Sequence, residues 1–535
     1  MHRWSWAVLA TVIVLGAASS SSHRVDRVSS TNPFPGCAPP PAPGQPVGVA
    51  VGVVACQELT THLLGNAVAA PFEYYVPPVC SAPGAGRCPV LYLLHGFGGS
   101  YNEMLGQPGT TSSAWIAAET SAPPAGFESA PWDFDNPSTW APAPSLGMVL
   151  VAPLGQTLPG GYGPGPGLDS YWVDWNPRYA KGGDSQRYDT PPPRFESYIV
   201  DELVPFVEAN LPAGTGRQFR AIAGVSLGGY GAYKLGLQHP DEWTTMMSVS
   251  GAHNFLFAPA PEPGEVTLPA GVAPPVPVTY TPLPPPTAAV PTAGAPSQVG
   301  TFTTAITAFG DPAADQAYFR GNMPTDLAMN GRAFDHQVSS LGIDGFVNDM
   351  IPMQTLSGDS AAAGNDVSSE PFENIVFPMN VDMESAFAEE GVANTFAVHQ
   401  GNHSDVYRNA WFRGLEEFAY GRLRHADGGG APPPAPTTFD YRSISTDFSI
   451  WGWHIQVDRT PVEFLTMRSV TCSGLTLQGT GVVTVTVPAA CHSGSGRSPT
   501  VVVDLGPSQA TSDPSGLGAT PLYGRTVTVA LSPLA

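Results

Sequence analysis

The sequence predicts an α/β fold with a doubly wound, mostly parallel sheet, followed by a small all-β domain. Two observations predict the first part. Short apolar runs alternate with helical stretches from about Cys56 to Gly421, and several of these runs end in loops rich in glycine or proline. A third observation predicts the second part, because beyond residue 438 the helical patterns give way to short β-rich runs separated by Gly, Ser and Pro. The strands expected there are residues 449–453, 482–487, 501–503 and 526–529.

The expected strands are continuous apolar runs, as in a sheet covered on both faces. They are residues 90–94, 148–152, 219–223, 245–249, 351–356 and 395–399. The expected helices show apolar residues at helical spacing, and Pro205 should kink the first of them. They are residues 196–210, 229–239, 380–390 and 410–423.

Composition shifts along the chain predict its domain boundaries. A short apolar run followed by small residues indicates a secretory signal peptide at the N-terminus. The expected segments are a signal peptide (1–19), a Ser/Pro-rich segment (20–55), the α/β domain (56–425), a linker (426–438) and a β-sandwich-like domain (439–535). A Pro-rich insertion at 258–298 interrupts the α/β domain and is either a lid or an unstructured insert.

Charge limits the possible partners. The net charge is −22, from 22 basic and 44 acidic residues, and the only lysines are Lys181 and Lys234. No basic patch could follow a phosphate backbone, so nucleic acid is excluded as a partner. After residue 19 no segment is apolar enough to span a bilayer, so we expect no stable membrane insertion once the signal peptide is removed. The sequence does not indicate an oligomeric state.

Six cysteines fit an exported protein. Proximity along the chain favours three pairs, although six cysteines allow 15 connectivities. These pairs are Cys37 with Cys56, Cys80 with Cys88, and Cys472 with Cys491. No C-x-x-C spacing suggests a zinc site.

The segment Gly224-Val225-Ser226-Leu227-Gly228-Gly229 contains the candidate nucleophile. It is a G-x-S-x-G sequence between an expected strand and an expected helix. A sharp strand-to-helix turn would expose the Ser226 hydroxyl, and Gly224 and Gly228 would permit the close packing that such a turn requires. The alternative is an ordinary glycine-rich turn.

A serine needs a base to accept its proton and a donor pair for the oxyanion that forms. His403 follows the last expected strand, in Gln400-Gly401-Asn402-His403-Ser404, and is the candidate base. The backbone N–H groups of Phe97 and Leu227 are the candidate oxyanion donors. Phe97 lies in His95-Gly96-Phe97-Gly98-Gly99, and Leu227 directly follows the serine.

These segments, with Ser170-Tyr171-Trp172-Val173-Asp174-Trp175, resemble the secreted esterase family of the α/β-hydrolase fold, which includes mycolyltransferases, S-formylglutathione hydrolases and feruloyl esterases. The resemblance covers roughly residues 60–425. It implies that Glu373, in Phe372-Glu373-Asn374-Ile375-Val376, is the acid that orients His403, and it places Trp172, Asp174 and Trp175 near the pocket. Position after a strand leaves Asp366 and Asp359 open as alternatives for the acid.

The leading hypothesis is therefore a secreted serine hydrolase that cleaves carboxylic esters through an acyl-enzyme on Ser226. Its substrate would be a small molecule, a glycolipid or a polymer, and the chemistry needs no metal or organic cofactor. The same residues allow an acyltransferase that moves the acyl group to a sugar hydroxyl. A third hypothesis is a non-catalytic extracellular binding protein, whose tail could bind carbohydrate through Trp451 and Trp453, although tryptophans in strands are more often core.

Overall fold

The structure is a computed structural model of the whole chain. It describes just over half of the sequence in separate stretches, and all statements below concern these residues. They are 36–42, 45, 47–65, 68–111, 113–122, 141–142, 145–157, 169–177, 192–253, 255, 257–259, 280–282, 308–310, 315–328, 376, 379–380, 383, 386–387, 390–392, 412–425, 427–432, 434–460, 462–491, 499–507 and 525–531.

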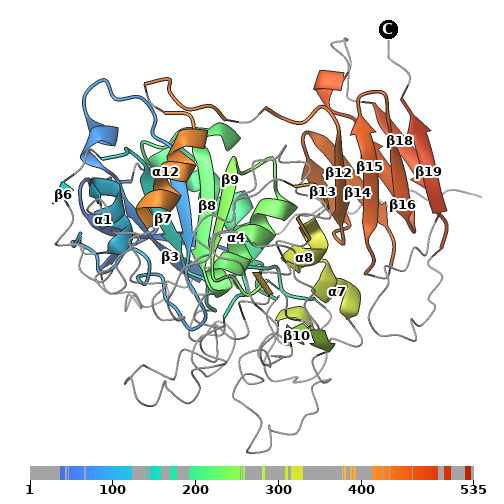
Figure 1. Cartoon of the computed structure of the whole chain (residues 1–535), viewed down its shortest axis with the longest axis horizontal. Helices are drawn as coiled ribbons and strands as arrows, with labels where there is room; N and C mark the ends of the chain where they lie inside the picture. Colours follow the sequence, from blue (N-terminus) through green and yellow to red (C-terminus); the bar gives the residue numbers. More distant parts are fainter. Residues whose placement is uncertain are drawn as a thin grey trace, which may run out of the picture. The chain divides into compact units, whose positions relative to one another are not determined.

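A seven-stranded, mostly parallel sheet forms the first part of the described chain (Figure 1). The strand order is β1-β2-β3-β7-β4-β8-β9, and the neighbours β7, β4, β8 and β9 are all parallel. Only the pairs β2·β3 and β3·β7 are antiparallel. The strands are β1 Cys37–Ala38, β2 Val54–Thr61, β3 Val68–Tyr75, β4 Val90–Leu94, β7 Val149–Pro153, β8 Arg220–Val225 and β9 Thr245–Val249.

Two apolar cores lie on opposite faces of this sheet. Alternate residues of β4 belong to different cores, as the two-residue period of a strand requires: Tyr92 joins one core and Leu93 the other. Helix α4 (Leu227–Gln238) packs in the first core. Helices α1 (Ala114–Thr120) and α12 (Phe412–Arg422) pack in the second. The central strands are buried on both faces, which explains their continuous apolar sequences.

The expected strands 90–94 and 245–249 have the bounds of β4 and β9, and the other two in the described chain are β7 and β8. The expected helix at 196–210 is also present, but its form differs. It runs as α2 (Phe195–Ser197), a π-helical stretch η5 (Tyr198–Leu203) and α3 (Val204–Asn210). Pro205 has no N–H for the ordinary helical hydrogen bond, and the wider π register lies directly before it.

Several expected elements lie outside the described residues. They are the strands 351–356 and 395–399 and most of the insertion 258–298. β10 (Phe257–Pro259), at the start of that insertion, pairs antiparallel with β11 (Tyr280–Pro282), which lies within it. Two further short strands, β5 (Ser121–Ala122) and β6 (Ala141–Pro142), also pair antiparallel.

In the described part of the C-terminal region, two four-stranded antiparallel sheets share one apolar core, and a short 3-10 helix, η9 (Ala489–Cys491), follows β17. One sheet has the order β12-β15-β16-β19 and the other β13-β14-β17-β18. The strands are β12 Phe439–Ser443, β13 Asp447–Ile450, β14 Trp453–Asp458, β15 Leu465–Thr471, β16 Gly474–Gly479, β17 Val482–Thr486, β18 Thr500–Asp504 and β19 Arg525–Ala530.

One prediction for this region was wrong. The run 449–453 is not a single strand, because Trp451 and Gly452 both have positive φ, 51° and 80°, and form the turn between β13 and β14. Trp453 is 3% exposed in the core, so it is not a surface residue for binding carbohydrate. Trp451 lies at the turn, with the Arg217 guanidinium over its ring, and its backbone N–H donates to the Asp241 carboxylate.

The three predicted disulfides are confirmed: Cys37–Cys56, Cys80–Cys88 and Cys472–Cys491. The first joins register partners of β1 and β2, so it fixes a two-residue edge strand to the sheet. Among the described helices, none has the length and apolar character needed to cross a bilayer.

Candidate active site

Ser226 occupies a sharp turn between β8 and α4. Its backbone has φ 56° and ψ −118°, a conformation that is strained for a residue with a side chain and that persists only where the surroundings enforce it. The Ser226 N–H donates to the carbonyl of Val249 at 2.8 Å, and its own carbonyl accepts from Ala252 at 3.3 Å. The turn is therefore bound to the end of β9 as well as to its own helix.

The two glycines flanking Ser226 are required by close packing, as predicted. A Cβ at Gly224 would lie 2.1 Å from the carbonyl oxygen of Gly228, and a Cβ at Gly228 would lie 1.9 Å from the carbonyl oxygen of Leu94. Both contacts are with backbone, which cannot move aside as a side chain can. The second contact also holds the start of α4 directly against the end of β4, where the loop 95–99 begins.

In the loop 95–99, the backbone N–H groups around Phe97 all donate hydrogen bonds within the protein. The N–H of Gly96 donates to Glu103 (3.4 Å), that of Gly98 to Asp169 (2.9 Å) and that of Gly99 to the carbonyl of Gly96 (3.2 Å). The Phe97 N–H has no acceptor among the residues that the structure describes. Its side chain is 41% exposed.

The side chain of His95 links this loop to the segment that contains Gly155. Its Nε2 accepts from the N–H of Gly155 at 2.9 Å, so Nδ1 carries the proton and donates to the Gly96 carbonyl at 2.9 Å. Burial lowers the pKa of His95 to about 4, against a smaller opposing effect of the Gly96 carbonyl, so the ring is neutral at pH 7. The ring of Trp172 meets it edge-on, with centroids 5.0 Å apart.

Leu227 is the first residue of α4, so its N–H has no partner within the helix. No acceptor for it lies in the described part of the chain. A helix N-terminus also carries partial positive charge, which favours an anion there. Leu227 directly precedes Gly228, whose contact with Leu94 brings the start of α4 to the beginning of the loop that contains Phe97.

His403 and the three candidate acids, Glu373, Asp366 and Asp359, lie outside the described residues. The described helical residues that follow in the chain begin at Val376. Asn380 donates from Nδ2 to the carbonyl of Gly251 at 3.0 Å. Since the next residue, Ala252, binds the carbonyl of Ser226, this helical segment is connected to the serine turn through two hydrogen bonds.

Two polar residues near the turn were missed from the sequence. Asp169 binds the loop 95–99, and burial raises its pKa to about 6, although hydrogen bonds from Gly98 and Gln156 oppose this. Its only signal was its place directly before Ser170. His253 is fully buried, shares a 3.2 Å hydrogen bond with Ser248 and stacks on Tyr233. Burial lowers the pKa of His253 to about 3, so it is neutral.

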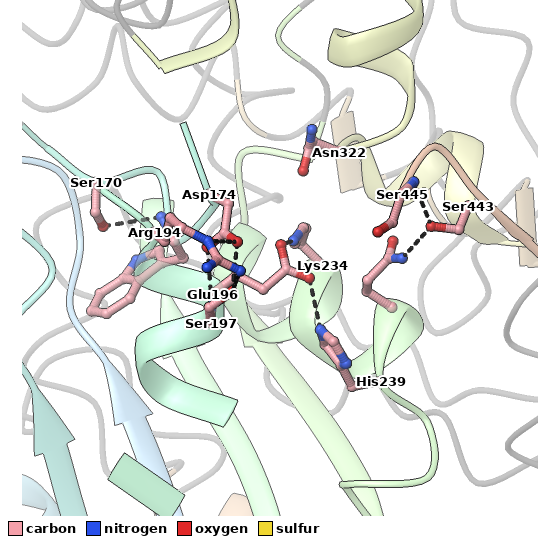
Figure 2. A network of polar contacts seen from close by, with 12 residues as sticks. Ser170, Asp174, Arg194, Glu196, Ser197, Lys234, His239, Asn322, Ser443 and Ser445 are labelled. Carbon is pink, nitrogen blue, oxygen red and sulfur yellow. Dashed lines mark hydrogen bonds and ion pairs between the residues drawn. The ribbon is translucent and has the colours of Figure 1, made fainter. Parts of the chain in front are cut away.

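Further along α4, a polar network joins the helix to α2 (Figure 2). The carboxylate of Glu196 pairs with Lys234 through one oxygen and with His239 through the other, at 2.7 Å. Burial alone would raise the pKa of Glu196, but the charge of Lys234 and the bond and charge of His239 lower it to about 2. Asp174 accepts hydrogen bonds from the backbone N–H and the hydroxyl of Ser197, and its expected place near the pocket stays a prediction. Trp172 and Trp175 are buried.

Within the described residues, no group of three or more His, Cys, Asp or Glu side chains is placed to hold a metal ion.

The strand order and the strand–serine–helix turn together define an α/β-hydrolase fold. Residues 170–274 match the family described as "Putative esterase". The matched segment contains β8, Ser226, α4 and β9. It confirms the resemblance that the motifs indicated, and it supports hydrolysis of esters.

Solved structures with a similar fold were also found. An S-formylglutathione hydrolase from Agrobacterium tumefaciens is 14% identical over 70% of this chain and 98% of its own, with a TM-score of 0.40. MPT51 (FbpC1) of Mycobacterium tuberculosis is 15% identical over 69% and 97%, with a TM-score of 0.34. The fluorophosphonate-binding serine hydrolase F of Staphylococcus aureus is 12% identical over 69% and 99%, with a TM-score of 0.37. These TM-scores are below 0.5, so the fold assignment stands on the strand order and the family match.

Proposed function

We propose that this protein is a secreted serine esterase that acts through an acyl-enzyme on Ser226. The observation that carries the proposal is the strained turn at Ser226, packed through Gly228 onto the end of β4. This packing brings the serine next to the loop whose Phe97 N–H has no described acceptor. An esterase needs these two parts together, since attack on a carbonyl creates charge on its oxygen.

In the proposed reaction, His403 takes the proton from the Ser226 hydroxyl as the oxygen attacks the ester carbonyl. The N–H groups of Phe97 and Leu227 stabilise the tetrahedral oxyanion, and Glu373 orients the imidazole and stabilises its protonated form. His403 then protonates the leaving alcohol. Water, activated by the same imidazole, attacks the acyl-enzyme and releases the acid.

The direct test is covalent labelling. A fluorophosphonate probe should label the purified protein on Ser226, and Ser226→Ala should abolish both labelling and hydrolysis of p-nitrophenyl esters. Ser473→Ala, in the C-terminal region, is the matched control and should retain both. Full hydrolysis by Ser226→Ala would refute the proposal. Product analysis with an added acceptor sugar separates hydrolysis from acyl transfer.

The identity of the acid is tested by comparing three variants. Glu373→Gln should lower kcat by at least about 100-fold, because the orienting charge behind His403 is lost. Asp366→Asn and Asp359→Asn should lower it by less than about threefold. If one of these aspartate variants shows the large loss instead, that residue is the acid and Glu373 is not.

Secretion is the other part of the proposal. The three disulfides support it, since such bonds form and persist in oxidising compartments. Expression with the native N-terminus, followed by N-terminal sequencing of protein from the medium, should give a mature chain that begins near residue 20. Recovery of the full-length chain only from the cytoplasm would contradict it.

A further inference from the structure

We infer that Asp169 is a positioning residue for the oxyanion site, acting through the backbone of Gly98. The inference rests on the proposed function and adds to it a residue that does not itself touch the substrate. Asp169 is 8% exposed, and its Oδ1 accepts from the Gly98 N–H at 2.9 Å across 71 positions of sequence.

The direction of the Phe97 N–H is set by its own peptide unit, which also contains the Gly96 carbonyl. In a trans peptide these two groups point in opposite directions. His95 and the N–H of Gly99 both donate to that carbonyl, at 2.9 and 3.2 Å. They hold the oxygen inward, so the Phe97 N–H is directed away from them.

The next peptide unit is where Asp169 acts. Gly98 has φ 72°, and a glycine has a wide choice of conformations, so this point of the loop would move freely without an external bond. The bond from its N–H to Asp169 is that external bond. A carboxylate is a stronger acceptor for a backbone N–H than a neutral group. Asp169 thereby fixes the orientation of the peptide between Phe97 and Gly98, on the C-terminal side of the Phe97 N–H.

Asp169 can do this because it is itself held. It forms an isolated antiparallel bridge with Gln156, whose side chain also donates to its carboxylate. Directly after it, Trp172 is packed in a turn of positive φ between His95, Gly155 and Gly231. One segment therefore supports the loop at two points, through the carboxylate at Gly98 and through the indole at His95.

The test separates positioning from general stability. Asp169→Ala should lower kcat for a p-nitrophenyl ester by about 10- to 100-fold, somewhat less than loss of an oxyanion donor itself, and leave KM within about twofold. Affinity for phenylboronic acid, which forms a tetrahedral adduct with the serine, should fall by a similar factor. Asp169→Asn should restore most of both, because its amide oxygen can still accept from Gly98.

The matched control is Asp504→Ala. Asp504 also accepts from a glycine N–H, that of Gly506 at 2.8 Å, but in the C-terminal region, so kcat and boronate affinity should stay unchanged. If Asp169→Ala does not fold, Gln156→Leu is the second variant, with an expected fall of about threefold or more in both quantities.

Three results would overturn the inference. They are an unchanged kcat in a folded Asp169→Ala, a lower kcat with unchanged boronate affinity, and an unchanged kcat in Gln156→Leu where Asp169→Ala cannot be used. Failure of the proposed function would look different, since Ser226→Ala would then keep the activity of the wild type.

Discussion

The two ends of helix α4 are built in opposite ways. At the N-terminal end, Ser226 has a strained backbone and the N–H of Leu227 has no described acceptor. In the C-terminal half, Lys234 is 1% exposed and paired with Glu196, and Gln238 donates to Tyr441 and Ser443. At one end the N–H of Leu227 has no acceptor among the described residues, whereas at the other the Lys234 ammonium and the Gln238 amide nitrogen are bound to other parts of the protein.

This difference shows how the fold can tolerate strain at the candidate site. Residues in sparsely populated conformations cost about 1–3 kcal/mol each and need surroundings that over-determine them. The helix that follows Ser226 is buried along its whole length, and ion pairs hold its far half to α2. Close packing of Gly224 and Gly228 against neighbouring backbone holds the N-terminal end of α4 in place. Ion pairs with Glu196 hold its C-terminal half.

Gly228→Ala should have the largest effect. Its Cβ would lie 1.9 Å from the Leu94 carbonyl oxygen, so the start of α4 must move away from β4. We expect a loss of more than about 100-fold in esterase activity and of about 3 kcal/mol in unfolding free energy. Urea denaturation and p-nitrophenyl ester kinetics measure both.

The control for this substitution lies in another helix. A Cβ at Gly414, in α12, meets nothing within 4 Å, so Gly414→Ala should be neutral or stabilise the protein by up to about 1 kcal/mol. If Gly414→Ala lowered activity and stability as much as Gly228→Ala does, the contact with the end of β4 would not be the reason for glycine at position 228.

Lys234→Met should remove the ion pair that holds the C-terminal half of α4, and so lower the free energy of unfolding while leaving esterase activity nearly unchanged. The substitution leaves the Glu196 carboxylate with His239 alone, and removal of one partner of a buried pair costs about 3 kcal/mol. In the folded fraction, kcat should stay within about threefold. Chemical denaturation at pH 7 and kinetics in native buffer check the two parts separately.

Two further variants test whether the loss of stability in Lys234→Met comes from leaving a buried charge unpaired. Lys234→Met combined with Glu196→Gln should recover part of the lost stability, because no unpaired charge remains. Arg468→Met removes a pair in which the arginine is 50% exposed, and should cost less than about 1 kcal/mol. A similar small loss for Lys234→Met would contradict the role assigned to burial.

The sequence predicts the parts of this molecule that local patterns encode. Continuous apolar runs locate β4 and β9, and a serine between glycines locates the turn at 226, because both signals lie within a few residues. The pairing of cysteines by proximity also succeeds, since each bond spans at most 19 positions.

Contacts between distant segments were not predictable in the same way. Asp169 and Gly98 are 71 positions apart, and Lys234 and Glu196 are 38 apart, so neither pair has a local signature. The hairpin at Trp451 was missed for a different reason. A tryptophan with positive φ is uncommon, and the run 449–453 has the composition of a strand. The positions of His403 and Glu373 stay predictions from their motifs.

The smallest expected effect is a pH dependence that arises at the end of α4. Burial alone would lower the pKa of His239, but its hydrogen bond to Glu196 and the charge of that carboxylate raise it above 6.5. A raised pKa in the folded state means that the pair stabilises the protein fully below pH 6.5 and that this contribution disappears as the pH rises through the folded value. Wild type should therefore lose stability relative to His239→Gln between pH 6 and pH 9, measured by urea denaturation.

His454→Gln provides the comparison, since His454 and its partner Asp447 are 42% and 61% exposed. An exposed pair contributes little, so this variant should follow the wild-type pH profile within about 0.5 kcal/mol. If His239→Gln follows wild type equally closely, the imidazole of His239 carries no charge that matters to folding. Among the residues that the structure describes, Lys234 would then be the one cation that stabilises Glu196, and this pair would hold the far half of α4 with no contribution that varies with pH near neutrality.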